Sequence, residues 1–463
     1  MQYYIPKSLN DLPDRLIKEI VSGEKLVMHH MEKIWHVIDK LYLETLYRRN
    51  HEHGELIRLH SKVCESLYQS RAWGKIRKAL VKLNIIEVGD SYQPNIHSKG
   101  YQLKEIYLND SFAIIDLPES YFNKKLIKKD DWNNTYKRCY SNLSKRITID
   151  YKSAIKHIIQ KLSFSNNEIE KKVWMLYKRL VLCSSPKLNE AAYCIDNELI
   201  NDGMVSLDNL FLNYRVEHSN KYSCPIKKPQ RYTYHKFKFD LLSILKITNK
   251  QFFFSVDSNS GRIYHNISNI RRELKQFIQI DGVNMVGLDI RNSQPLLFGL
   301  LLVKKWRKRK ATSYEIMPDL KEYLQRCCDG NFYNHLMELN DIPLEQRAEY
   351  KVQFFTDVFF SKNPKMVKGA LKQFEEIYPN VYQEIRKYKE QDYKLLAHDL
   401  QKFEADVIIN GIIKSLFKQN KEIPIVNVHD AIYTAPDFAP IVENEIYNYF
   451  MNEFGVTPTL NRE

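Results

Sequence analysis

Apolar residues recur at helical spacing in the N-terminal part of the chain. Over residues 26–47 they return every three or four positions, as at Ile34 and Ile38, which predicts a helix with one buried face. Residues 56–68 and 70–88 are expected to form two further helices, and the polar segment that follows is expected to form a strand, a turn and a strand.

This succession resembles a winged helix-turn-helix, which would occupy residues 1–110. The second helix of the pair would bury Trp73, Ile76, Leu80 and Leu83. Its opposite face would carry the cations Arg71, Lys75, Lys78 and Lys82, with Lys99 in the wing. Such a face suits phosphates or base edges. A small structural module with a solvated basic face is the alternative, and a winged helix can also bind protein, so sequence-specific DNA binding is a hypothesis.

The middle region, residues 111–250, has fewer signals. Helices are expected at 151–163 and at 166–183, with Ser165 as the N-cap of the second. A basic, turn-rich stretch follows at 219–236. The region is therefore expected to be mainly helical.

Charge points to a polyanionic partner. The chain has 463 residues, a formal net charge of +14 and a pI of about 9.1, and Lys and Arg that neutralise phosphates release counterions. The longest apolar run, Pro295 to Val303, is far shorter than the roughly 20 residues that span a bilayer. The N-terminus lacks a signal-peptide pattern, and the seven cysteines include no C-x-x-C pair. We expect a cytoplasmic nucleic-acid-binding protein without a membrane segment.

Two apolar segments far apart in the chain each deliver an acid. The run from Val286 ends in Asp289 and precedes a helix from Pro295, and the β-rich segment 423–433 presents Asp430 in a turn. A lone strand-end Asp is usually a turn or cap residue. Two carboxylates on separate strands can instead clamp the pair of divalent ions that phosphoryl transfer to a 3′ hydroxyl requires. Asp289 and Asp430 are the candidate catalytic metal ligands.

Between these acids, one predicted helix combines cations and aromatic rings. Arg347, Lys351, Phe355 and Phe359 recur at every fourth position and share one stripe. Arg347 and Lys351 could hold the phosphates of a nucleoside triphosphate, with Lys351 also protonating departing pyrophosphate, while the rings pack on sugar and base. The alternative is an amphipathic helix with buried Phe side chains and snorkelling cations.

The motifs together resemble family A, the polymerase I-type DNA polymerases. The R-x-x-x-K-x-x-x-F-x-x-x-F helix is similar to the fingers O-helix, LDIRNSQP to motif A and VHDA to motif C. DSNSGRIYHNISNI, FEEIYPNVYQEI and QKFEADVII resemble three further segments of that family. The resemblance covers about residues 255–435. It implies that Arg262, Gln401 and His429 contact primer and template, and Asp406 keeps the family's spacing.

The chain departs from the family at three points. Gln294 stands where the DNA polymerases carry a Glu that blocks the 2′ hydroxyl, and Phe359 replaces the Tyr that supports this gate. Gln294 has the bulk of Glu, which favours deoxynucleotides, but selection against ribonucleotides is expected to be loose. Ala431 replaces an auxiliary acid. The segment from Phe359 to Gln401 is short, and no proofreading domain is expected.

The expected fold is α+β and mainly helical, with a winged helix-turn-helix at 1–110, a thumb-like helical region at 111–250, and polymerase palm and fingers at 251–463. The expected activity is DNA-directed DNA synthesis with dNTPs and two Mg²⁺ ions, Mn²⁺ being the alternative ion, in replication of a phage, plasmid or other mobile element. Replication proteins of the host or element are candidate partners. The basic run 304–310 is either a solvated helix end or a contact to DNA.

Two rival functions remain open. A single-subunit RNA polymerase or primase would use rNTPs, and GRIY is also similar to a motif of those enzymes. A DNA-binding replication initiator would have lost catalysis. Retention of Asp289, Asp430, Arg347 and Lys351 together argues against the second rival.

Overall fold

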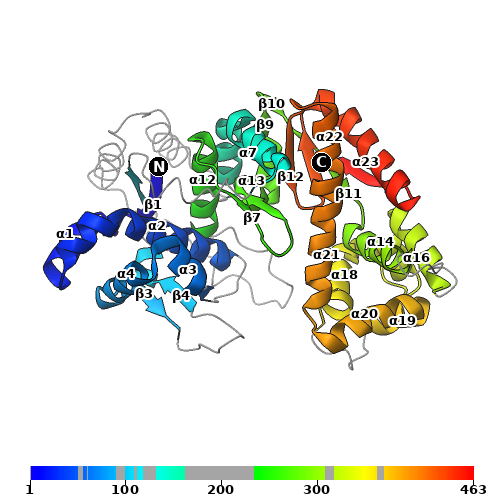
Figure 1. Ribbon diagram of the computed structural model, residues 1–463, viewed down its shortest axis with the longest axis horizontal. Helices are drawn as coiled ribbons and strands as arrows, with labels where there is room; N and C mark the ends of the chain where they lie inside the picture. The colour runs from blue at the N-terminus through cyan, green and yellow to red at the C-terminus, as the bar shows by residue number, and fades with distance from the viewer. Residues whose placement is uncertain are drawn as a thin grey trace. The chain divides into compact units, whose positions relative to one another are not determined.

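The computed structural model describes residues 2–50, 56–59, 61–89, 100–108, 112–117, 132–161, 234–307, 317–361 and 370–462. Helices predominate within these ranges, and short strands form several small sheets. Residue contacts divide the chain into two compact units (Figure 1). The first comprises Met1–Lys128 and Ile149–Gln251, and the second comprises Lys129–Thr148 and Phe252–Glu463.

Several predictions fall outside the described residues. They concern the helix at 166–183 with its N-cap Ser165, most of the basic stretch at 219–236, Lys99 of the expected wing, and residues 308–310 of the basic run. These remain predictions.

A long helix organises the first unit. Helix α2 (Gly23–Asn50) confirms the helix predicted at 26–47, and it packs on strand β1 (Gln2–Pro6) and on α12 (Tyr234–Thr248). Strand β1 pairs antiparallel with β5 (Phe112–Asp116) over its whole length. Ile34, Ile38 and Leu41 of α2 are buried in this core as the helical spacing predicted, whereas Met28 is exposed.

A buried ion pair joins α2 to α12. The Asp39 carboxylate accepts a hydrogen bond from the backbone N–H of Tyr4 at 2.8 Å, and Lys246 Nζ lies 3.3 Å from each of its oxygens. The ammonium also lies 5.0 Å from the centre of the Tyr4 ring. Burial raises the pKa of Asp39, and Lys246 and the Tyr4 N–H only partly offset this. Both carboxylate oxygens therefore have donors.

The same unit contains a helix pair followed by a hairpin. Along the chain come β2 (Ile57–Arg58), α3 (Ser61–Tyr68), α4 (Ser70–Lys82), β3 (Ile86–Val88) and β4 (Gly100–Leu103). Strand β4 lies between β2 and β3 and is antiparallel to both. The prediction of one helix over 56–68 is wrong at its start, because the chain there extends and pairs with β4. The prediction of one helix over 70–88 is wrong at its end, because α4 stops at Lys82 and Ile86–Val88 pair with β4.

Helix α4 separates apolar and basic side chains as predicted. Trp73, Ile76 and Leu80 are buried, and Tyr68 stacks on the Trp73 ring with centroids 5.6 Å apart. The cations Arg71, Lys75, Lys78 and Lys82 are exposed. Lys82 Nζ donates to the carbonyl of Glu19 at 2.9 Å.

The second unit is built on a four-stranded sheet. Its order is β12 (Ile425–Val428), β13 (Ala431–Thr434), β11 (Val286–Ile290) and β14 (Leu460–Arg462). Strand β11 is central and antiparallel to both neighbours. Helix α23 (Ala439–Phe454) packs against β11 and β13. The strands predicted around both acids are confirmed.

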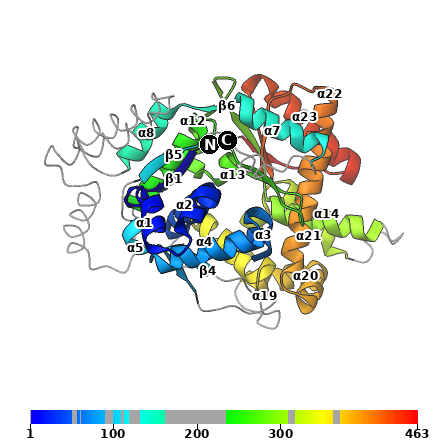
Figure 2. The ribbon, with the colours of Figure 1, turned by 60° about the vertical axis from the view of Figure 1, so that its left-hand side comes forward.

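Long helices cover this sheet. Helix α14 (Ser293–Arg307) follows β11, and α7 (Asn134–Arg146) packs on β12. A continuous rod forms from α21 (Leu395–Ala405), the π-helical segment η5 (Asp406–Ile413) and α22 (Lys414–Gln419). Figure 2 shows this rod with α14 beside α21. The rod brings side chains from residues 395–405 to the end of α14 that follows the central strand.

An aromatic cluster holds together the remaining helices of this unit. They are α16 (Asp319–Cys328), α17 (Phe332–Glu338), α18 (Arg347–Phe354), α19 (Ala370–Ile377) and α20 (Pro379–Gln391). Rings from four of these helices and from the residue before α20 meet edge to face or tilted at 5.3 to 5.5 Å: Tyr323, Phe332, Phe354, Phe374 and Tyr378. Edge-to-face pairs add stability beyond the area they bury.

The other elements are short. They are η1 (Lys7–Leu9), α1 (Leu12–Glu19), α5 (Glu105–Leu108), β6 (Ile147–Ile149), α8 (Tyr151–Gln160), β7 (Phe254–Val256), β8 (Ile263–His265), α13 (Asn266–Asn269), η2 (Arg272–Phe277), β9 (Ile278–Ile280), β10 (Val283–Asn284), η3 (Leu344–Gln346), η4 (Phe355–Phe359) and η6 (Pro436–Phe438). Helix α8 begins at the residue predicted for the helix at 151–163.

Candidate active site

Strand pairing brings the two predicted acids to neighbouring positions. Asp289 of β11 pairs with Ala431 of β13, and Asp430 immediately precedes Ala431. Residues that face each other across antiparallel strands have Cα atoms about 4.5 to 5.5 Å apart. Asp430 lies in the two-residue turn between β12 and β13, where His429 has φ = 56°. Both acids are half-buried, so each retains solvent access.

A glycine sets the register of these strands. Gly287 pairs with Tyr433, and a Cβ atom at Gly287 would lie 2.6 Å from the Tyr433 ring. The ring thus occupies the place of a side chain at position 287. Because a slip by one residue would move every side chain to the other face, this fit fixes the level of Asp289 against the turn.

Two buried polar residues hold the turn. The Asn427 amide donates to the carbonyl of His429 at 2.8 Å, and His265 Nε2 lies 2.7 Å from the Asn427 carbonyl. His265 Nδ1 accepts hydrogen bonds from backbone N–H groups at the start of α13, so Nε2 carries the proton. Burial lowers the pKa of His265 to about 4. His265 and Asn427 were not predicted as site residues.

A tight turn between β7 and β8 delivers Arg262. The Asp257 carboxylate accepts hydrogen bonds from the N–H and hydroxyl groups of Ser260, at 2.8 and 2.5 Å. Gly261 has φ = 76°, and Tyr136 donates its hydroxyl to the Gly261 carbonyl at 3.1 Å. A side chain at position 261 would be strained in this left-handed conformation. The turn therefore presents Arg262 toward the rod formed by α21.

The third partner of this arrangement is Glu404, which the sequence analysis missed. Its side chain is 2% exposed, and its Oε2 atom accepts from Arg262 at 2.6 Å and from Gln294 Nε2 at 2.8 Å. Burial raises the pKa of Glu404 to about 7, with Arg262 opposing this shift and Asp430 adding to it. The available signal was a single acid between Phe403 and Ala405 on an otherwise apolar helix face. Three elements thus converge on one carboxylate beside Asp430.

His429 lies against the same group of residues. Its ring meets that of Tyr264 edge to face, with centroids 5.9 Å apart. Burial lowers the pKa of His429, and so does the positive charge of Arg262, whereas Asp430 raises it. Gln401, another predicted contact, is half-buried one turn before Glu404 on α21. Each predicted primer-template contact therefore lies next to an acid. Arg262 binds Glu404, Gln401 shares α21 with Glu404, and His429 precedes Asp430 in the turn.

The predicted nucleotide-binding helix changes geometry along its length. It is α-helical over α18 and π-helical over η4. Arg347 Nε donates to Asn334 at 2.8 Å and stacks on Tyr333, whose ring centre is 5.7 Å away. Lys351 is exposed, and its Nζ atom lies 5.9 Å from the Tyr333 ring centre. Tyr333 and Asn334, both on α17, orient the two cations and were not predicted.

The two aromatic residues of that stripe differ in exposure. Phe355 is half-buried and lies 6.0 Å from Phe359, whereas Phe359 is fully buried against Phe298 of α14, with centroids 5.7 Å apart. Phe298 lies one helical turn after Gln294, so both share a face of α14. The end of η4 therefore packs near the residue that Glu404 binds.

The start of the basic run makes protein contacts. Lys304 Nζ lies over the Phe403 ring at 5.3 Å, and Lys305 Nζ pairs with Glu384 at 2.9 Å. Glu384 also accepts from Lys387 at 2.6 Å. Lys304 and Lys305 thus contact other residues of the protein, and these contacts explain both cations without DNA. Residues 308–310 lie outside the described residues.

The acidic residues offer a sparse donor set. Within the described ranges, no cluster of three or more His, Cys, Asp or Glu residues could hold a metal. Two carboxylates nevertheless suit Mg²⁺, which keeps several waters and is bound by one or two carboxylates together with substrate phosphates. Asp289 and Asp430 thus fit a magnesium site completed by substrate.

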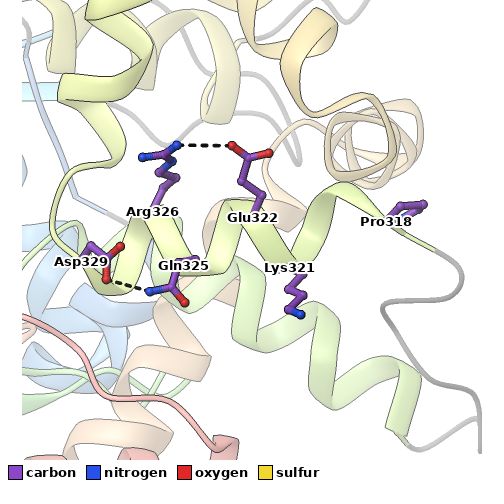
Figure 3. Close-up of a pocket in the computed structure, with 6 residues that line it drawn as sticks. All are labelled: Pro318, Lys321, Glu322, Gln325, Arg326 and Asp329. Atoms are coloured by element: carbon purple, nitrogen blue, oxygen red, sulfur yellow. Dashed lines mark hydrogen bonds and ion pairs between the residues drawn. The ribbon is translucent and has the colours of Figure 1, made fainter.

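A surface pocket lies along α16, apart from the predicted site residues. Its lining side chains are of both charges, and Figure 3 shows Arg326 paired with Glu322 and Gln325 with Asp329. Lys321 points away from these pairs in the same view.

Among the described helices, none is long and apolar enough to cross a membrane.

Comparisons with known proteins give limited information. No protein-family model matches the sequence, and no curated protein matches it. Among solved structures, one match is the POL domain of Pol1 from M. smegmatis in complex with DNA primer-template and dNTP. The two share 14% identity with a TM-score of 0.30, over 71% of this chain and 68% of the other. So low a TM-score supports no conclusion about activity, which must come from the residues of the site.

Proposed function

We propose that the chain is a template-directed DNA polymerase that adds dNTPs to a primer 3′ end. The observation that carries this proposal is the register of β11 and β13, which sets Asp289 opposite the residue after Asp430. The sequence between these acids supplies a helix with exposed or half-exposed cations. Paired carboxylates and a phosphate-binding helix are the parts that nucleotidyl transfer requires.

The acids and the cations would act on different parts of the nucleotide. Asp289 and Asp430 would hold Mg²⁺, which when bound neutralises charge on the attacking and leaving oxygens. Arg347 and Lys351 would bind the β and γ phosphates, and Lys351 would pass a proton to departing pyrophosphate. Tyr333 holds both cations on one side of α18, which reduces the entropy that they lose on binding.

Residues around Asp430 would contact the nucleic acid and the sugar. Arg262 binds Glu404, and His429 interacts electrostatically with Asp430. With Gln401, Arg262 and His429 would bind the primer-template. Gln294 would face the 2′ position of the incoming nucleotide, while Phe355 packs on its sugar or base. Phe359 would support this pocket from the core, because it is buried against Phe298.

The N-terminal unit would contribute a DNA-binding module. The helix pair α3 and α4 and the hairpin β3–β4 have the order of a winged helix, and β4 lies between β2 and β3. The exposed Arg71, Lys75 and Lys78 of α4 would contact phosphates. A fused DNA-binding module suits replication of a phage, plasmid or other mobile element in the cytoplasm, with replication proteins of the host or element as further partners.

Primer extension tests the proposal directly. A labelled DNA primer on a DNA template would be incubated with Mg²⁺ and either dNTPs or rNTPs, beside Asp289→Ala and Asp430→Ala. We expect extension with dNTPs that both substitutions abolish. Synthesis with rNTPs alone would identify an RNA polymerase or primase. Intact DNA binding without any synthesis would identify a DNA-binding protein and overturn the proposal.

A further inference from the structure

The two oxygens of the Glu404 carboxylate differ in the hydrogen bonds that they accept. Its Oε2 atom accepts from both Arg262 and Gln294, whereas its Oε1 atom is buried without a hydrogen-bond partner among the described residues. A buried charge is costly unless its oxygens are satisfied. Stability alone would be better served by an apolar residue or by a carboxylate with donors on both oxygens. The arrangement therefore indicates a role for Glu404 at the site.

What Glu404 does to Gln294 follows from their hydrogen bond. Gln294 lies at the start of α14, five residues after Asp289, and is half-buried. A free Gln side chain samples several rotamers, and a flexible side chain is a poor steric barrier. Donation from Nε2 to Glu404 removes that freedom and turns the amide oxygen the other way.

Among the described residues, α18 and η4 supply no hydrogen bond to Gln294. Phe359 has no hydroxyl, and its ring is buried against Phe298 rather than against a polar group. Arg262 in turn holds Glu404 in place at 2.6 Å. The side chain of Gln294 is therefore held by hydrogen bonds that run from Arg262 to Glu404 and from Gln294 to Glu404, and not by a residue of η4.

We propose that Glu404 is a positioning residue that fixes the Gln294 side chain as a barrier to the 2′ hydroxyl of an incoming ribonucleotide. This inference rests on the proposed polymerase function. Glu404 touches neither nucleotide nor metal in this role. It acts through Gln294, and the quantity that it controls is the preference for dNTP over rNTP.

The test is single-nucleotide incorporation with dATP and with ATP opposite the same template base. The ratio of kcat/KM for the two nucleotides would be measured for wild type, Glu404→Met, Gln294→Met and the double variant. Met preserves volume but cannot accept or donate this hydrogen bond. We expect the ratio to fall about tenfold in either single variant, as for loss of one hydrogen bond, and no further in the double variant.

Two more variants separate positioning from folding. Glu404→Gln keeps an acceptor for Gln294 and should retain most of the preference. Glu384→Gln is the matched control, because Glu384 is also buried in this unit and also pairs with two donors, Lys305 and Lys387. It should leave the ratio unchanged. If Glu404→Met does not fold, Glu404→Asp carries the test, because its shorter side chain draws the acceptor away from Gln294; an unchanged ratio in that variant would overturn the role of Glu404.

The outcomes distinguish this inference from the function on which it rests. Incorporation by wild type with an unchanged ratio in Glu404→Met would overturn the role of Glu404 and leave the polymerase intact. Additive losses in the double variant would do the same, because they would show that the two residues act separately. Absence of incorporation by wild type would overturn the polymerase and this inference with it.

Discussion

Each compact unit contains a buried ion pair, and the two pairs are built differently. In the first unit, Asp39 has donors on both oxygens from Lys246 and from the Tyr4 N–H. In the second, Glu404 receives both of its hydrogen bonds on one oxygen, and the negative charge of Asp430 opposes its ionisation. In a fully satisfied pair, removal of one partner leaves the other charge without compensation, which is costly. A pair left incomplete beside another acid indicates a site at which ligands complete the charge balance.

The largest effect on activity should come from removing Asp430, the acid beside the Glu404–Arg262 pair. Asp430→Asn takes away a proposed metal ligand and a charge that adds to the rise that burial causes in the pKa of Glu404. Primer extension should fall by about 1000-fold or more, because metal stabilisation of the transition state is worth several kcal/mol. Single-turnover extension measures this. Asp437→Asn, at an exposed acid in the same region, is the control, and a loss below tenfold in Asp430→Asn would contradict the assignment.

Breaking the satisfied pair should affect stability instead. Asp39→Asn leaves the half-buried Lys246 ammonium without a counter-charge, so the free energy of unfolding should fall by about 3 kcal/mol. Urea denaturation would measure the change against Asp14→Asn, an exposed acid of the same unit. Extension by the folded fraction should keep its preference for dNTPs. A change below about 0.5 kcal/mol would show that this pair contributes no more than surface pairs do.

Titration of Glu404 should make the free energy of unfolding depend on pH, and the substitution Glu404→Gln should remove that dependence. The pKa of Glu404 is raised from 4.5 to about 7, so between these values the folded chain holds a proton that the unfolded chain has lost. Stability from this group is present below pH 4.5 and is lost as the pH rises through 7. The change is at most about 3 kcal/mol. Glu404→Gln should flatten it, as measured by urea unfolding in EDTA at pH 5 and pH 8.

Glu384→Gln is the matched comparison for that experiment, with the opposite sign. Burial disfavours the charged form of Glu384, but hydrogen bonds from Lys305 and Lys387 outweigh it and lower the pKa. Wild-type stability from this group is lost as the pH falls through the folded pKa. If both Gln variants changed the pH profile in the same direction, the opposite pKa shifts assigned to Glu404 and Glu384 would be wrong.

The smallest effect should come from a pair that is not buried. Arg386 and Glu390 are i,i+4 neighbours on α20, 2.9 Å apart and both 54% exposed. Exposed helix pairs are worth about 0.3 to 0.5 kcal/mol, so Glu390→Gln should shift the free energy of unfolding by no more than that. The shift should vanish in 1 M NaCl. A larger, salt-independent effect would mean that pairing rather than burial governs the two buried cases.

Local pattern predicted much of the secondary structure. Apolar spacing predicted α2, α4 and the strands that precede Asp289 and Asp430, because periodicity reports directly which face is buried. It failed at Ile57–Arg58, since two residues carry no periodic signal and their conformation depends on pairing with β4. The π-helical segment Phe355–Phe359 was missed because, over a single turn, the spacing of apolar residues does not distinguish a π-helix from an α-helix.

The site was predictable only in part. Acids at the ends of apolar runs identified Asp289 and Asp430, because a charge adjoining a buried segment is conspicuous in sequence. Their relative position depends on the register of β11 with β13, which the sequence does not state. Glu404 went unnoticed because its partner Arg262 lies 142 residues away, and local pattern shows burial but not what a buried side chain meets.

The two-residue turn at His429 and Asp430 makes the hairpin intolerant of changes in length. A residue inserted between Val428 and Ala431 would shift β13 by one step relative to β12 or bulge the turn away from Asp289. Tyr433 would then no longer fill the space over Gly287. Natural or engineered variants of this chain should therefore accept substitutions around the turn far more readily than insertions or deletions within it.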